Sequence, residues 1–164
     1  MRWLDRLLSR EGPYVARQIA ELRATDSRVE LAGEVEALEL LRDPVDDEPA
    51  VVLNYRARRP GVAQRYFGIH GSEGEIEAYE ATNFVLRDAS GAALIQVERG
   101  GDVGQLHAKL REQFGVDLQA SVEQVGPGDR VRVRGRLRAH SVGGSPHRRE
   151  PWTVVVILDE LEDA

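Results

Sequence analysis

Apolar residues near the start of the chain recur at the spacing of an α-helix. In RWLDRLLSR the apolar residues share one helix face and the charged residues occupy the others. The apolar face comprises Trp3, Leu4, Leu7 and Leu8. A second helical piece is expected in PYVARQIAELRA, where Pro13 suits a first turn. The pattern therefore predicts an N-terminal helical segment over residues 1–27.

From Arg28 onward the hydrophobic period changes to two, which is typical of half-buried strands. RVELAGEVEAL has Val29, Leu31 and Val35 on one face and glutamates on the other. VVLNYRAR and EIEAYEA are expected to form the arms of a long hairpin, and NFVLRDASGAALIQVE a strand, a turn and a strand. DRVRVRGRLRAH and WTVVVILDELED are the last two strands.

One interior helix interrupts the strands, in GDVGQLHAKLREQFGVD. Asp102 is a candidate cap, Gly115 is placed to end the helix, and His107 is expected to be a solvent-facing or boundary residue. The inward stripe is Val103, Leu106, Leu110 and Phe114. A helix between the third and fourth core strands is the arrangement of an OB-type barrel.

The predicted fold is therefore mainly β. It is an OB-like β-barrel with one helix between the third and fourth core strands, a long hairpin insertion and the N-terminal helical segment. Residues 28–164 are expected to form the single barrel domain.

The composition narrows the classes of function. The 164 residues carry a net charge of −6, which argues against a general polyanion binder. The chain has no cysteine, which excludes disulfides, cysteine-based zinc fingers and a thiol nucleophile. No apolar run approaches the roughly 18 residues of a spanning helix. A cytoplasmic location is expected, with peripheral membrane contact as an alternative.

Every second residue of DRVRVRGRLRAH is an arginine, and we call this series the arginine ladder: Arg130, Arg132, Arg134, Arg136 and Arg138. Side chains alternate along a strand, so one face is apolar and the other is lined with guanidinium groups. The first and fourth strands of an OB-like barrel pair antiparallel. The pattern therefore predicts that Glu30, Glu34 and Glu36 lie beside the ladder and neutralise it. The alternative is nucleic-acid contact, with Arg134, Arg136 and Arg138 as candidates.

The hairpin tip, RRPGVAQRYFGIH, combines basic and aromatic residues: Arg58, Arg59, Arg65, Tyr66 and Phe67. They are expected to pack within the hairpin, and the alternative is contact with a partner or stacking on nucleic-acid bases. The glutamates of EGEIEAYE, namely Glu73, Glu75, Glu77 and Glu80, are expected to pair with Arg56, Arg58 and Arg59. The alternative for them is a cation or basic-peptide site.

Four stretches together resemble the GIDE domain, also called the "beside a membrane" domain. They are VELAGEVEAL, DPVDDEPAVVLNYRAR, NFVLRDASGAALIQV and VGPGDRVRVRGRL, from about Val29 to Leu137. The most distinctive part is Asp43-Pro44 followed by a strand ending in Tyr55-Arg56. The resemblance implies a small β-barrel module that recognises a partner. Its ubiquitin-ligase member uses a RING finger, which needs cysteine ligands for zinc.

We therefore expect a non-enzymatic protein-interaction module with no ubiquitin-ligase activity, no cofactor and no metal. The alternative function is single-stranded nucleic-acid binding through the arginine ladder and the hairpin tip. The apolar face of Trp3, Leu4, Leu7 and Leu8 is expected to dock on the barrel or in a homo-oligomer. Its alternative is an anionic membrane surface.

Overall fold

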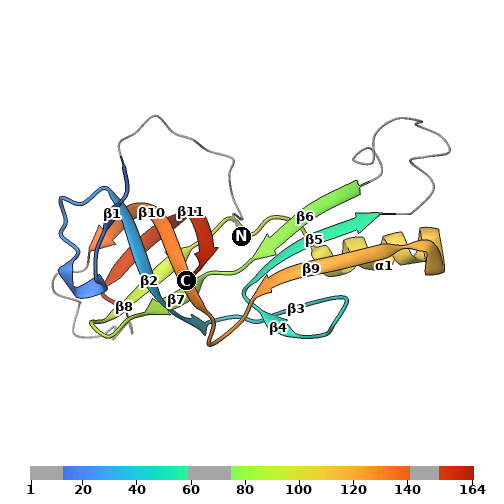
Figure 1. Cartoon of the computed structure of the whole chain (residues 1–164), viewed down its shortest axis with the longest axis horizontal. Helices are drawn as coiled ribbons and strands as arrows, with labels where there is room; N and C mark the ends of the chain where they lie inside the picture. The colour runs from blue at the N-terminus through green and yellow to red at the C-terminus, as the bar shows by residue number, and fades with distance from the viewer. Residues whose placement is uncertain (1–12, 59–74, 141–151) are drawn as a thin grey trace. The chain divides into compact units, whose positions relative to one another are not determined.

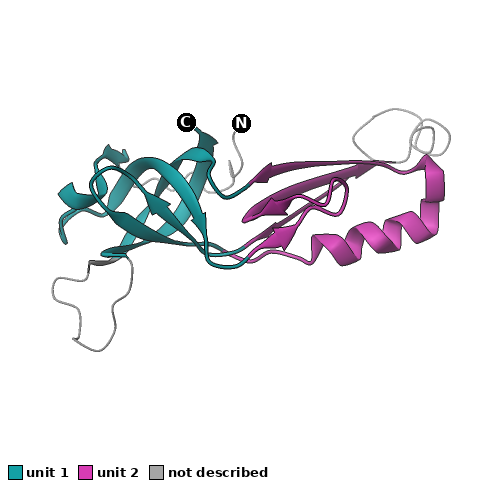
Figure 2. Cartoon of the chain, turned by 90° about the horizontal axis from the view of Figure 1, so that it is seen from below, with its two compact units in different colours: residues 1–39, 82–97, 126–164 teal, residues 40–81, 98–125 magenta. Residues whose placement is uncertain are grey.

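The computed structural model describes residues 13–58, 75–140 and 152–164, which are mainly β-strand with one α-helix (Figure 1). The described chain divides into two compact units, coloured separately in Figure 2. The first comprises residues 1–39, 82–97 and 126–164, and the second comprises residues 40–81 and 98–125. Residues 28–164, expected to form a single domain, contribute to both units. Both segments of the second unit are inserted between strands of the first.

The first unit, here the barrel unit, is a closed five-stranded barrel. Its strands are β2 (Arg28–Ala37), β7 (Phe84–Arg87), β8 (Ala92–Gln96), β10 (Arg130–His140) and β11 (Val154–Asp163). They pair in the cyclic order β2-β7-β8-β11-β10 and back to β2. The β8–β11 pairing is parallel and the other four are antiparallel. This closed barrel is consistent with the OB-like prediction.

Strand β2 closes the barrel because it pairs with two neighbours in succession. Residues 28–34 pair with β10, and residues 34–37 pair with β7. A side chain at Gly33 would place its Cβ 2.5 Å from the carbonyl oxygen of Arg87, so only glycine lets β7 approach β2 this closely. The interior is filled by alternating apolar residues, including Val29, Leu31, Phe84, Ile95, Val133, Val156 and Leu161.

The N-terminal segment is held on the barrel without an α-helix, so the helical prediction for residues 13–27 is wrong. Strand β1 (Val15–Ala16) pairs parallel with β2, and a 3₁₀ turn, η1 (Ile19–Glu21), follows. The N–H of Ile19 donates to Asp88 Oδ2 at 2.8 Å, and that tertiary hydrogen bond replaces one within a helix. Residues 1–12, with the predicted first helix, lie outside the described residues.

The second unit is a three-stranded antiparallel sheet with α1 (Val103–Phe114) packed on one face (Figure 2). The sheet order is β6-β5-β9, formed by β6 (Glu75–Ala81), β5 (Val52–Arg58) and β9 (Gln119–Val125). A small hairpin, β3 (Leu41–Arg42) with β4 (Pro49–Ala50), adds to its core, and η3 (Gly115–Asp117) links α1 to β9. The prediction missed β9 as a strand.

The helix itself follows the sequence closely. Asp102 accepts a hydrogen bond from the Gln105 N–H at 2.8 Å, and Gly115 ends the helix at a φ of 56°. Val103 and Leu110 are buried, and Leu106 and Phe114 pack against the same core. In the order of the chain the helix follows β8 and precedes β10, the third and fourth barrel strands, as predicted.

Candidate functional site

The arginine ladder lies on β10, between β2 on one side and β11 on the other. Arg134 is its most enclosed member, with about a quarter of its side chain exposed. Its Nε lies 2.6 Å from Glu30 Oε2, and its Nη1 lies 3.0 Å from Glu160 Oε2 and 3.5 Å from Glu162 Oε1. Hydrogen bonds to Glu30 and then Glu160 raise the pKa of Arg134 above its already high usual value.

The neighbours of Arg134 on the ladder are also paired. Arg132 Nε lies 3.7 Å from Glu30 Oε1, and its Nη1 lies 3.9 Å from Glu162 Oε2. Arg136 Nε donates to Asp159 Oδ1 at 3.1 Å. These three arginines therefore contact four carboxylates: Glu30, Asp159, Glu160 and Glu162. The middle of the ladder has no surplus positive charge with which to attract a polyanion.

A further contact joins the N-terminal segment to this network. Tyr14 donates its hydroxyl to Asp159 Oδ2 at 3.2 Å, and the Arg28 guanidinium lies 4.0 Å from the centre of the Tyr14 ring. Burial raises the pKa of Tyr14, although its hydrogen bond with Arg28 opposes that shift. The network therefore also holds the N-terminal segment on the barrel.

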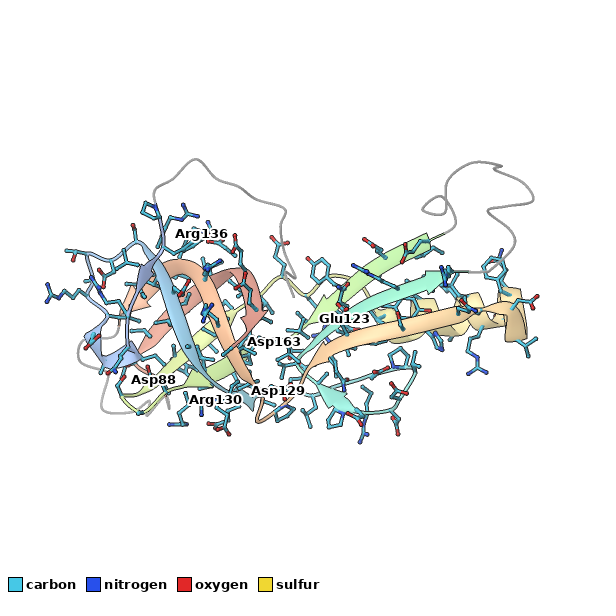
Figure 3. The ribbon with its side chains drawn as sticks, viewed as in Figure 1. Asp88, Glu123, Asp129, Arg130, Arg136 and Asp163 are labelled. Atoms are coloured by element: carbon cyan, nitrogen blue, oxygen red, sulfur yellow. The ribbon has the colours of Figure 1, made fainter. Side chains whose placement is uncertain are left out.

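The two ends of the ladder differ from its middle. Arg138 donates to Gln96 Oε1, a neutral partner. Arg130 stands opposite Glu34 in the register, and no described ion pair involves it. Figure 3 labels Arg130 and Arg136 toward opposite ends of the strand. Arg130 also lines a groove of about 540 Å³, together with Glu34, Glu36, Arg87, Asp88, Pro127 and Gly128.

The prediction for the three glutamates of β2 is confirmed for two of them. Glu30 bonds to the ladder, and Glu34 lies opposite Arg130. Glu36 does not reach the ladder, because β2 has by then moved to β7, and it accepts from Arg87 Nη2 at 2.9 Å. The sequence analysis did not identify the carboxylates of β11 as partners of the ladder. The alternation of Glu160, Leu161 and Glu162 is the strand signal that could have revealed them.

Asp88 holds the turn at one wall of the groove. Its Oδ1 accepts from the N–H groups of Ser90 and Gly91, and its Oδ2 accepts from Ile19. Burial alone would raise the pKa of Asp88. The hydrogen bonds from the Ser90 hydroxyl and from the three N–H groups outweigh burial and lower the pKa below its usual value. This carboxylate is fully engaged, so it is a structural residue.

On the second unit, the glutamates of β6 divide between two roles. Glu77 pairs with Arg56 across the hairpin at 3.5 Å, as predicted, and Glu75 stands opposite Arg58 in the strand register. Glu80 is buried and accepts from the Val103 N–H at 3.0 Å, so it stabilises the helix N-terminus instead. Arg58 also donates to Gln119 at 3.2 Å.

His107 is the clearest error of the sequence analysis, because it is buried and not at the solvent boundary. The Tyr55 hydroxyl lies 2.8 Å from His107 Nδ1, and the two rings meet edge to face. Burial, with the nearby positive charge of Arg111, lowers the pKa of His107, while Asp43 opposes the shift. The lowered pKa favours a neutral imidazole, and its contact with the Tyr55 hydroxyl is a buried hydrogen bond of the core.

Several candidate residues cannot be placed. Arg59, Arg65, Tyr66 and Phe67, together with Glu73, lie outside the described residues, and so do Trp3, Leu4, Leu7 and Leu8. Within the described ranges no group of three metal-ligating side chains occurs. No helix in the described part of the chain is long and apolar enough to cross a membrane.

Comparison with known proteins adds no relative. No protein-family model matches the chain, and no curated protein matches it. The arrangement of charged residues on the barrel and the exposed surfaces of the second unit are therefore the basis for any functional inference.

Proposed function

We propose that this protein is a non-enzymatic interaction module that binds another protein, built on an OB-like barrel of the GIDE type. The supporting observation is the enclosure of Arg134 between Glu30 and Glu160. The basic strand is the strongest nucleic-acid signal in the sequence, and the protein's own carboxylates neutralise most of it. Because these arginines are mostly neutralised, the charge of the barrel surface favours a protein partner over a polyanion.

The barrel topology supports the OB-like part of the proposal. Five strands in the cyclic order β2-β7-β8-β11-β10, with a helix between the third and fourth strands, match that architecture. The GIDE resemblance of the sequence covers four of these strands, β2, β7, β8 and β10, and also the inserted β5. The insertion of a sheet and a helix into the barrel connections gives the protein a second surface for recognition.

A salt-dependent binding titration tests this proposal against nucleic-acid binding. The full chain is titrated into fluorescent single-stranded DNA and RNA at about 50 mM and about 200 mM salt. We expect no binding tighter than the roughly 10⁻⁴–10⁻⁶ M typical of non-specific contacts. Tight binding that weakens steeply with salt, and that Arg138→Ala weakens further, would refute the proposal.

A second experiment identifies the protein partner. The immobilised full chain is exposed to native lysate, and each captured protein is then purified and titrated against the chain by calorimetry. We expect at least one saturable complex with defined stoichiometry that survives moderate salt.

A further inference from the structure

The outer edge of β9 is the longest strand edge of the second unit that lacks a partner among the described residues. All seven residues of β9 pair with β5, from Gln119 opposite Arg58 to Val125 opposite Val52, without a bulge. In the sheet order β6-β5-β9, no described strand follows β9 on its other side. A regular edge of this kind presents alternating N–H and C=O groups to an incoming strand.

The sequence of β9 lacks the devices that usually protect such an edge. It contains no lysine, arginine or proline, and Glu123 is its single charged residue. Its side chains alternate, with Ala120 and Val122 packed toward α1 and Ser121 exposed on the opposite face. The edge is therefore regular, half-apolar and open to pairing.

The opposite edge of the same sheet is protected. Residues 99–101 run beside β6, where the Ala81 N–H donates to Arg99 O at 2.9 Å and the Gly101 N–H donates to Tyr79 O at 3.0 Å. The rest of that edge carries Glu75 and Glu77. The contrast between the two edges singles out β9.

The charges around β9 indicate the chemistry of its occupant. Glu123 forms no ion pair with any described residue, and Figure 3 labels it on the sheet. Glu48 lies at the same end of the strand, where its Oε2 accepts from Gln124 Nε2 at 2.9 Å. The segment 112–125 contains acidic residues and no basic one. A second copy of this chain would bring the same negative charges to the edge, whereas a basic segment would complement them.

We infer that β9 is a docking edge for an extended, lysine- or arginine-bearing peptide segment of another protein, which adds to the sheet as a fourth strand. The main-chain hydrogen bonds of β9 supply affinity, and Glu123 with Glu48 selects positive charge near the C-terminal end of the strand. This inference rests on the proposed function and specifies the partner of that interaction module.

The test uses the full chain and a defined probe, the acetylated and amidated peptide TKVKVKT. We expect saturable binding in a fluorescence titration, and slower hydrogen exchange of the amides of residues 119–125 by about tenfold or more. Two control peptides separate the contributions. TEVEVET keeps the strand propensity and reverses the charge, and TKVPVKT places a proline in the middle of the strand. Both should bind much more weakly.

A matched pair of variants locates the site. Glu123→Lys on β9 should weaken binding of TKVKVKT roughly threefold to tenfold at low salt. Glu75→Lys makes the same change of charge on the opposite edge of the sheet and should leave binding within about twofold. Circular dichroism establishes that both variants fold.

Three results would overturn this inference. The first is equal weakening by both variants, which would show attraction to net charge alone. The second is concentration-dependent dimerisation that protects residues 119–125 without peptide, which would make a second copy the occupant. The third is a protein partner that binds the barrel unit and leaves the amides of β9 unprotected. That third outcome would leave the proposed function intact, whereas salt-sensitive binding to nucleic acid would refute the proposed function itself.

Discussion

Replacing Arg134 with methionine removes the guanidinium that joins β2 to β11 and keeps an unbranched apolar stem. The lost contacts are the 2.6 Å bond to Glu30 and the 3.0 Å bond to Glu160. A charge-assisted hydrogen bond contributes about 1.5–3 kcal/mol, and this site is about a quarter exposed, so the contribution must be reduced for screening by solvent. Three carboxylates, Glu30, Glu160 and Glu162, also lose their shared cation.

We therefore expect Arg134→Met to lower the free energy of unfolding of the barrel unit by about 2 kcal/mol at pH 7. For a protein of this size, that loss corresponds to a fall in Tm of about 4–8 °C. The assay is urea unfolding followed by tryptophan fluorescence. Trp152 belongs to the barrel unit, so its fluorescence reports on that unit.

Arg130→Met is the matched control, because Arg130 occupies the same face of the same strand and is exposed. Its cost should be within about 0.5 kcal/mol of zero. Equal costs for the two variants would refute this reasoning.

Four further predictions concern other parts of the fold. The pKa of His107 is lowered in the folded state, so the second unit should lose stability as the pH falls below about 6.5. His107→Gln should flatten that dependence in urea unfolding monitored by circular dichroism. The pKa of Asp88 is also lowered, so Asp88→Ala should destabilise the barrel unit by about 2 kcal/mol at neutral pH. That difference should persist down to about pH 4 and shrink as the pH falls further, through the lowered pKa of Asp88, as measured by tryptophan fluorescence. A Cβ at residue 135 would overlap the carbonyl oxygen of Ile157, so Gly135→Ala should lower Tm by several degrees, corresponding to roughly 1–3 kcal/mol. Gly104→Ala, in the exposed first turn of α1, should instead stabilise the second unit by about 0.5–1 kcal/mol in calorimetry.

Much of the barrel could be predicted because its local signals and its tertiary pairing agree. The alternation of Val29, Leu31 and Val35 with glutamates identified β2 as a strand with one buried face. The matching parity of the arginines in β10 then predicted which strand would lie beside it. The candidate site was only partly predictable, since Glu160 and Glu162 reach the ladder through the β10–β11 register, which one strand read in isolation does not reveal.

The amino-acid sequence by itself determined the elements whose stability is local: the alternating strands, the turn at Ser90-Gly91, and α1 with its Asp102 cap. These depend on side-chain periodicity and on hydrogen bonds between residues close in the chain.

Other features were decided only by the tertiary structure. In these, a backbone N–H group or a side chain binds a partner that is distant in the sequence. The segment after Pro13 has helical periodicity, yet Asp88 and the edge of β2 bind its N–H groups instead. His107 looks like a surface residue until Tyr55, on another element, covers it and satisfies its Nδ1. The sequence predicts that the glutamates of β2 neutralise the arginine ladder, whereas β11 supplies three of the four carboxylates that contact it. In each case the observed structure is stabilised by a contact between residues far apart in the chain. The local sequence pattern does not reveal such a contact.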